Sequence, residues 1–193
     1  MKSKGHFFSI FFVIASLWSI NLKAQSDILF GAKAGLNVSS LGGNAAYSYD
    51  AKVGFHIGGV LEIPFSDTIM IQPEALISLQ GSGGFFESDL NFWYLTIPVV
   101  AKYNVWDDLF IEAGPQLNLL LSDNLDDNFY GGSVGQQAIG ESNGLDFGLV
   151  VGAGYQLDDN FYFQLRFNVG FINAIKDVAS KNRVFQVSAV YFL

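Results

Sequence analysis

The 193-residue sequence contains no cysteine, which excludes disulfide bonds, thiolate metal sites and a lipid anchor on an N-terminal cysteine. It has no basic cluster either: 10 lysines and arginines stand against 18 aspartates and glutamates, which argues against a nucleic-acid partner. No linker or low-complexity tract divides the chain, so its length suits one domain. What is left is an acidic chain whose half-apolar composition, rich in glycine and phenylalanine, is unusual for a soluble protein.

Catalytic groups are also scarce. Outside the N-terminal leader, His56 is the only histidine, and its place inside an alternating stretch favours a buried structural role. No serine stands at the spacing of a nucleophile elbow, and the glycines of residues 152–154 do not open a helix as a phosphate-binding loop would. Asp123, Asp126 and Asp127 lack the ordered spacing of a calcium loop. We predict a protein that is not an enzyme and that binds no metal or cofactor.

The one long apolar run lies at the N-terminus. Two lysines precede an apolar stretch over residues 7–20, and a polar exit ends at Ala24. This order is typical of a secretory signal peptide, so we predict a signal peptide over residues 1–24 with cleavage before Gln25. The alternative, a retained membrane anchor, needs about 20 apolar residues, and the run is shorter. Loss of the leader removes three lysines and no acid, which changes the formal charge from −8 to −11.

Residues 25–193, predicted as one domain, contain eight stretches in which apolar and polar residues alternate. The stretches cover residues 28–38, 52–63, 69–80, 93–104, 109–121, 145–156, 161–171 and 185–193. A period of two is typical of β-strands that have one apolar and one polar face. Eight such stretches in succession predict an all-β chain.

The links between the stretches alternate in length. Those at residues 64–68, 105–108 and 157–160 are short, and those at 39–51, 81–90, 122–143 and 173–182 are long. Outer-membrane barrels have short periplasmic turns and longer external loops, and only a closed sheet can face lipid all round without a free edge. We therefore predict an eight-stranded antiparallel up-and-down transmembrane β-barrel in the outer membrane, in contact with its lipid. Aromatic residues at the strand ends fit two interfacial belts.

Several short motifs carry a family resemblance. Residues 31–37 (GAKAGLN) resemble the opening G-x-K-x-G-x-N of the Bacteroidetes-type outer-membrane β-barrel family, the PorT-like or "porin family" group. Residues 54–58 (GFHIG), 72–74 (QPE), 94–98 (YLTIP) and 166–167 (RF) are similar to its later motifs. The resemblance covers the whole mature chain and implies an eight-stranded barrel. Members of this family have varied roles, so the resemblance implies fold and location, not an activity.

Two positions depart from the family pattern. The chain ends in Leu193, where such barrels more often end in an aromatic residue, although Phe192 is adjacent. The pair Arg166-Phe167 stands where an Arg-Tyr pair is commoner.

Charged residues occur on the face of the strands that points inward. The set comprises Lys33, Lys102 and Arg166 on one side and Glu74, Glu112 and Asp146 on the other. An interior enclosed by eight strands is only wide enough for side chains. An unpaired charge there would cost several kcal/mol, so we predict a paired, structural charge network. The alternative is a narrow ion path.

The longest link offers the best place for recognition, because strand side chains are committed to lipid on one face and to the interior on the other. It combines acids and aromatics beside glycines, a composition that binding loops use. The candidate partner-binding residues are Asp126, Asp127, Phe129 and Tyr130. We predict a structural, binding or envelope-machinery role, with an envelope or secretion-machinery protein or a glycan as partner. The alternative function is a small porin-like diffusion channel.

Overall fold

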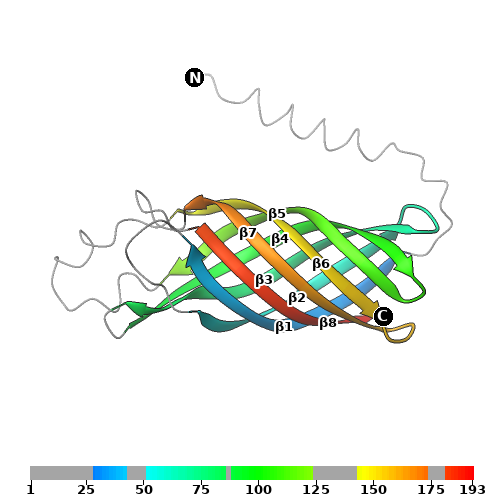
Figure 1. Ribbon diagram of the computed structural model, residues 1–193, viewed down its shortest axis with the longest axis horizontal. Helices are drawn as coiled ribbons and strands as arrows, with labels where there is room; N and C mark the ends of the chain where they lie inside the picture. Colours follow the sequence, from blue (N-terminus) through cyan, green and yellow to red (C-terminus); the bar gives the residue numbers. More distant parts are fainter. Residues whose placement is uncertain (1–27, 43–50, 86–87, 124–142, 174–180) are drawn as a thin grey trace, which may run out of the picture.

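The computed structural model describes residues 28–42, 51–85, 88–123, 143–173 and 181–193. These residues form a closed barrel in which each strand pairs antiparallel with the next and the last pairs with the first (Figure 1). The strands are β1 (Leu29–Gly42), β2 (Lys52–Pro64), β3 (Ile69–Phe85), β4 (Ser88–Trp106), β5 (Leu109–Asp123), β6 (Leu145–Gln156), β7 (Phe161–Asn173) and β8 (Lys181–Phe192). The predicted eight-stranded antiparallel β-barrel is confirmed.

The alternation in the sequence becomes an inside and an outside. In β8, for example, exposed and buried side chains alternate over almost the whole strand. Large apolar side chains such as Leu36 (60% exposed) and Val53 (66% exposed) cover the outer wall, whereas polar side chains are buried within. This is the reverse of a water-soluble protein and matches a wall that faces lipid.

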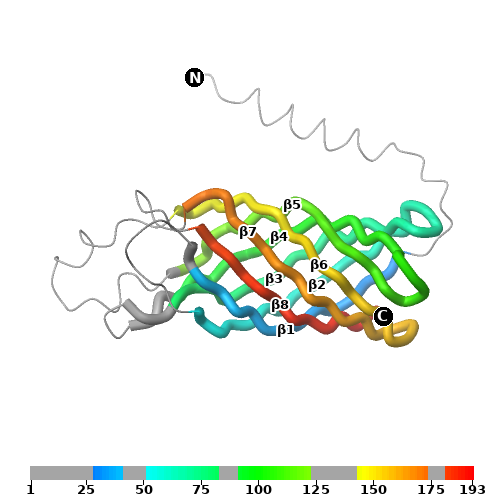
Figure 2. Tube along the Cα trace, viewed as in Figure 1, coloured from blue at the N-terminus to red at the C-terminus, as the bar shows by residue number. Residues whose placement is uncertain are grey.

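The first and last strands of the barrel meet at the rim that carries the short turns: β1 begins there and β8 ends there. Gly31 pairs with Phe192, and the amide of Leu193 donates to the carbonyl oxygen of Phe30 at 2.8 Å. Figure 2 shows the beginning of β1, in blue, and the end of β8, in red, at the same end of the barrel. With an even number of strands, both termini therefore lie on the periplasmic side.

The short turns are built by local chemistry. β4 and β5 are joined by two residues only, and Asp107 takes the positive φ (39°) that tight hairpins require. In the turn between β6 and β7 at the same rim, the Asp158 carboxylate accepts hydrogen bonds from the backbone amides of Asn160 (2.9 Å) and Phe161 (2.7 Å). Such aspartate turns stabilise the chain reversal without long loops.

The strands are longer than the sequence predicts, and one predicted loop is wrong. The sequence predicts a loop over the glycine- and serine-rich segment 81–90, but β3 and β4 continue their pairing into it, with Ser82 opposite Leu90 and Phe85 opposite Ser88. Gly81 takes a φ of 153°, and its amide and carbonyl both bond the Ser39 hydroxyl at 2.9 Å. Backbone pairing and this bond replace the apolar alternation that the segment lacks.

The last strand also begins earlier than predicted. β8 starts at Lys181 rather than at Phe185, because Lys181 pairs with Gly42 of an equally extended β1. Pairing between the first and last strands cannot be seen in the local pattern of either one.

An apolar layer closes the interior at the short-turn end. It consists of Val60, Phe110, Tyr162, Val190 and Phe192, each at most 7% exposed. Among the described residues, no helix is long and apolar enough to cross a membrane. The predicted signal peptide lies outside the described residues.

Candidate functional site

The middle of the barrel interior holds a chain of ion pairs, which we call the charge network: Lys33, Glu74, Arg166 and Glu112. Lys33 Nζ lies 2.9 Å from Glu74 Oε2, and Arg166 Nη2 lies 2.8 Å from Glu74 Oε1. Arg166 Nε donates to Glu112 Oε2 at 2.6 Å. These residues come from β1, β3, β7 and β5 and are at most 4% exposed. One arginine therefore bridges two carboxylates in a buried site.

Neutral donors complete the bonding of both carboxylates. The Tyr162 hydroxyl and the Gln164 amide donate to Glu112 Oε1 at 2.6 and 2.9 Å. The Gln72 amide donates to Glu74 Oε1 at 2.6 Å. A buried ion pair is stable only when its remaining lone pairs are satisfied, and these donors satisfy them.

A second ion pair lies toward the short-turn end. Lys102 Nζ contacts Glu62 Oε2 at 2.5 Å and lies 3.5 Å from the ring centre of Tyr162. The rings of Phe110 and Phe192 are 5.0 and 5.7 Å away. The ammonium group is thus held by one carboxylate and three aromatic faces, which attract a desolvated cation. Glu62 is missing from the charged interior set predicted from the sequence, although its position in the alternation of β2 places it on the inward face.

Asp146 faces inward but lies apart from the charge network. Its Oδ1 accepts the backbone amide of Ile172 at 3.1 Å, and its Oδ2 accepts longer bonds from Asn118 (3.5 Å) and Asn182 (3.4 Å). No ion pair joins it to a cation within the described ranges. Asp146 is near the beginning of β6, whereas the network lies at mid-barrel, so the predicted grouping of all six charges differs from the structure.

His56 belongs to a neighbouring polar cluster. Its Nδ1 lies 2.7 Å from Asn37 Oδ1 and its Nε2 lies 2.8 Å from the Ser188 hydroxyl. The Asn37 amide nitrogen donates to the Ser78 hydroxyl (3.0 Å) and to two carbonyls, and its Oδ1 also accepts from Gln186 (2.9 Å). Asn37 Oδ1 is therefore an acceptor, which assigns the proton to Nδ1 and makes Ser188 the donor to Nε2.

The order Ser188–His56–Asn37 is that of a nucleophile, a base and an orienting group. Catalysis would also need room for a substrate beside the hydroxyl. Ser188 is only 3% exposed and His56 only 1%, with the backbone of Gly35 packed against the imidazole. The arrangement therefore favours a structural cross-link between β1, β2 and β8.

Metal ligation has no support in the part of the chain that is described. No group of three or more histidine, aspartate or glutamate side chains there could hold a metal ion. The predicted partner-binding residues Asp126, Asp127, Phe129 and Tyr130 lie outside the described residues.

Comparisons with known proteins agree with this geometry. The family model described as "Outer membrane protein beta-barrel domain" matches residues 23–176. No curated protein shows significant sequence similarity. Neisserial surface protein A is similar in structure (TM-score 0.56, 9% identity, 84% of this chain and 96% of that chain). Ail, the attachment invasion locus protein of Yersinia pestis, is similar too (TM-score 0.52, 13% identity, 86% and 98%).

The two solved structures share the fold at low identity, and the family model covers most of the chain. The family model, together with the apolar outer wall of the barrel, places the protein in the outer membrane. The chain belongs to the outer membrane protein β-barrel domain family.

Proposed function

We propose that this barrel is a non-enzymatic scaffold that holds binding loops at the cell surface, with no pore through it. The observation that carries the proposal is the contact between Arg166 and Glu74. β7 and β3 lie four strands apart in the ring of eight, so this 2.8 Å contact spans the lumen from wall to wall. Layers of buried side chains lie on both sides of it.

A conductance measurement tests the closed interior. Purified protein inserted into planar bilayers is expected to give no steady single-channel current, because ions would have to displace buried, paired charges. A larger porin inserted under the same conditions is the positive control. Reproducible unitary currents from folded protein would favour the small diffusion channel instead.

We further propose that the protein belongs to the PorT-like group within its family. The support is that the motifs of the resemblance have one common role here. Lys33 and Glu74 carry the charge network, Asn37 holds the histidine cluster, and Gly35 makes room for the imidazole. These motifs specify the barrel interior. A role specific to this protein must then come from elsewhere, and the loops are the part free to supply it.

The loop between β5 and β6 is our candidate for partner binding, with a protein of the envelope or secretion machinery, or a glycan, as partner. Both ends of this loop are anchored by hydrogen bonds. The backbone amide of Leu120 donates to the Gly144 carbonyl oxygen at 2.9 Å, and the side-chain amide of Asn143 donates to the Asn173 carbonyl oxygen at 2.7 Å. Replacing residues 124–142 by a short Gly-Ser turn keeps both anchors. We expect the barrel to fold unchanged, because loop length has a small effect on stability.

Pull-down from native outer membranes measures the effect on binding. The shortened protein is expected to lose a partner that the unaltered protein retains. The matched control replaces residues 174–180 in the same way and should retain it. If the shortened barrel keeps every interaction, this loop is not the binding element.

A further inference from the structure

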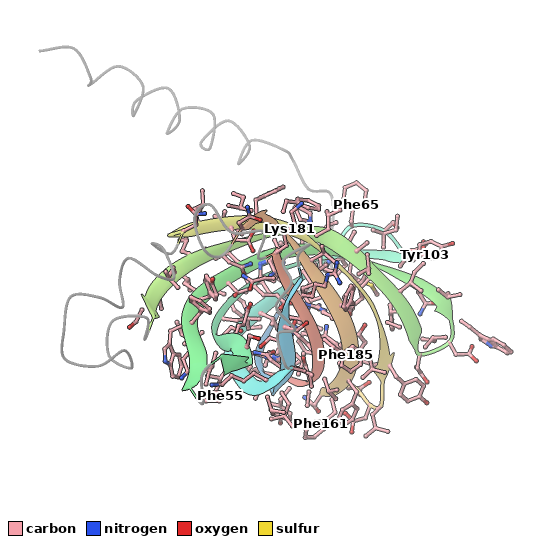
Figure 3. All side chains as sticks on the ribbon, turned by 60° about the vertical axis from the view of Figure 1, so that its left-hand side comes forward. Phe55, Phe65, Tyr103, Phe161, Lys181 and Phe185 are labelled. Carbon is pink, nitrogen blue, oxygen red and sulfur yellow. The ribbon has the colours of Figure 1, made fainter. Side chains whose placement is uncertain are left out.

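Two charged side chains lie on the outer wall of the barrel. All other described strand side chains on this wall are uncharged. Lys181 and Arg183, at the start of β8, are both exposed, while their neighbours Asn182 and Val184 are buried. They therefore point outward, into the same space that the apolar wall occupies. Figure 3 shows Lys181 at the start of β8 and Phe185 further along the strand.

The register places these two cations at the edge of the hydrocarbon layer. Phe185 pairs with Val38 and with Phe167, so all three outward residues at that level are apolar, and each is 42–43% exposed. One outward step further, Arg183 pairs with the polar Ser40 on one side and with the apolar Val169 on the other. One step beyond that, Lys181 pairs with Asn173. Polar neighbours thus first occur beside Arg183 and occur again beside Lys181, as expected where the hydrocarbon layer gives way to the headgroups.

Neither cation has a partner within the described chain. No ion pair or hydrogen bond joins Lys181 or Arg183 to another described residue. Both side chains lie on one strand two residues apart, about 7 Å by the rise of an extended chain. They can therefore approach one anionic group together, the arginine with two parallel donors and the lysine as a point charge.

The opposite rim has the opposite charge. The short turns contain Asp67, Asp107, Asp108, Asp158 and Asp159, all exposed, and no lysine or arginine. Anionic headgroups are repelled there. The charge distribution selects the external leaflet, because the long links face the cell exterior.

We propose that Lys181 and Arg183 form a binding site for the phosphorylated headgroup of an external-leaflet lipid, whose acyl chains continue along the apolar wall below Phe185. Two observations carry this assignment. The cations are complementary to phosphate, and the site is continuous with the lipid-contact surface. Each cation near an anionic lipid surface strengthens binding, and losing both should weaken it on the order of tenfold.

The test uses the full barrel in mixed micelles with equal amounts of phosphatidic acid and phosphatidylcholine. Native mass spectrometry gives the ratio of barrels that retain each lipid. The unaltered protein is expected to prefer phosphatidic acid, and the Lys181→Gln/Arg183→Gln variant to lose most of that preference. Heat-modifiable migration on gels confirms that each variant is folded.

Lys52→Gln is the matched control. Lys52 begins β2 at the same rim, but its pairing with the buried Ser39 turns it toward the lumen, so it should leave the preference unchanged. An equal loss in this control would show a general charge effect and overturn the site. So would an unaltered protein without preference. Displacement of the lipid by inorganic phosphate alone would overturn the assignment to a lipid.

Discussion

Replacing Arg166 by alanine is expected to lower the free energy of unfolding by about 3–5 kcal/mol, the usual cost of breaking a buried ion pair from one side. Arg166 of β7 is 1% exposed and bridges Glu112 of β5 and Glu74 of β3, the latter on the opposite side of the ring. Its removal leaves Glu112 without a cation and Glu74 with Lys33 alone.

Urea unfolding in detergent micelles measures this loss. Asn168→Ala is the matched control, since Asn168 is the next inward residue on β7 and neither its side-chain nitrogen nor its oxygen has a hydrogen-bond partner among the described residues. It should lose far less stability than Arg166→Ala. Arg166→Ala combined with Glu112→Gln should recover part of the loss, because the orphaned carboxylate is then neutral. An unchanged midpoint for Arg166→Ala would contradict the bridging role.

Adding one methyl group at Gly35 is expected to cost about 1–3 kcal/mol, the range for overpacking a filled interior. A Cβ atom there would overlap the backbone carbonyl of Val187 and lie 2.7 Å from His56 Nε2. The carbonyl is part of the β1–β8 pairing and cannot move aside. Gly35→Ala should therefore disturb both the barrel closure and the histidine cluster.

Gly59→Ala provides the comparison, because the same methyl group there meets nothing nearer than the Gly31 carbonyl at 3.9 Å. Gly59 lies on the outer wall, and its substitution should change stability by no more than about 0.5 kcal/mol. Urea midpoints of the two variants, measured side by side, check the difference. Equal midpoints would refute a steric role for Gly35.

The sequence predicts well which side of a strand each residue faces, but it predicts poorly which inward side chains lie close together. Period-two alternation correctly predicts that Lys33, Glu74 and Arg166 face inward, since the direction of a side chain depends only on its neighbours along one strand. Which inward residues meet depends on how strands are staggered around the ring. Glu62 and Lys102 are 40 residues apart and on strands that are not adjacent, so no local pattern indicates their contact.

The same limit explains the errors at strand ends. The segment 81–90 lacks apolar alternation, so it resembles a loop, yet its backbone is held by the partner strand. Lys181 and Arg183 also resemble loop residues, because charged side chains seldom face lipid. Their strand geometry comes from pairing with β1, at the other end of the chain.

Each β-hairpin of the barrel contributes one member of the charge network: Lys33 from the first, Glu74 from the second, Glu112 from the third and Arg166 from the fourth. Barrels of this kind change size by gaining or losing whole hairpins. Here, deletion of any one hairpin would leave the charge network with three of its four members, and insertion of a hairpin would widen the ring beyond the reach of the Arg166 side chain. The contacts of the charge network are therefore matched to a closed ring of eight strands.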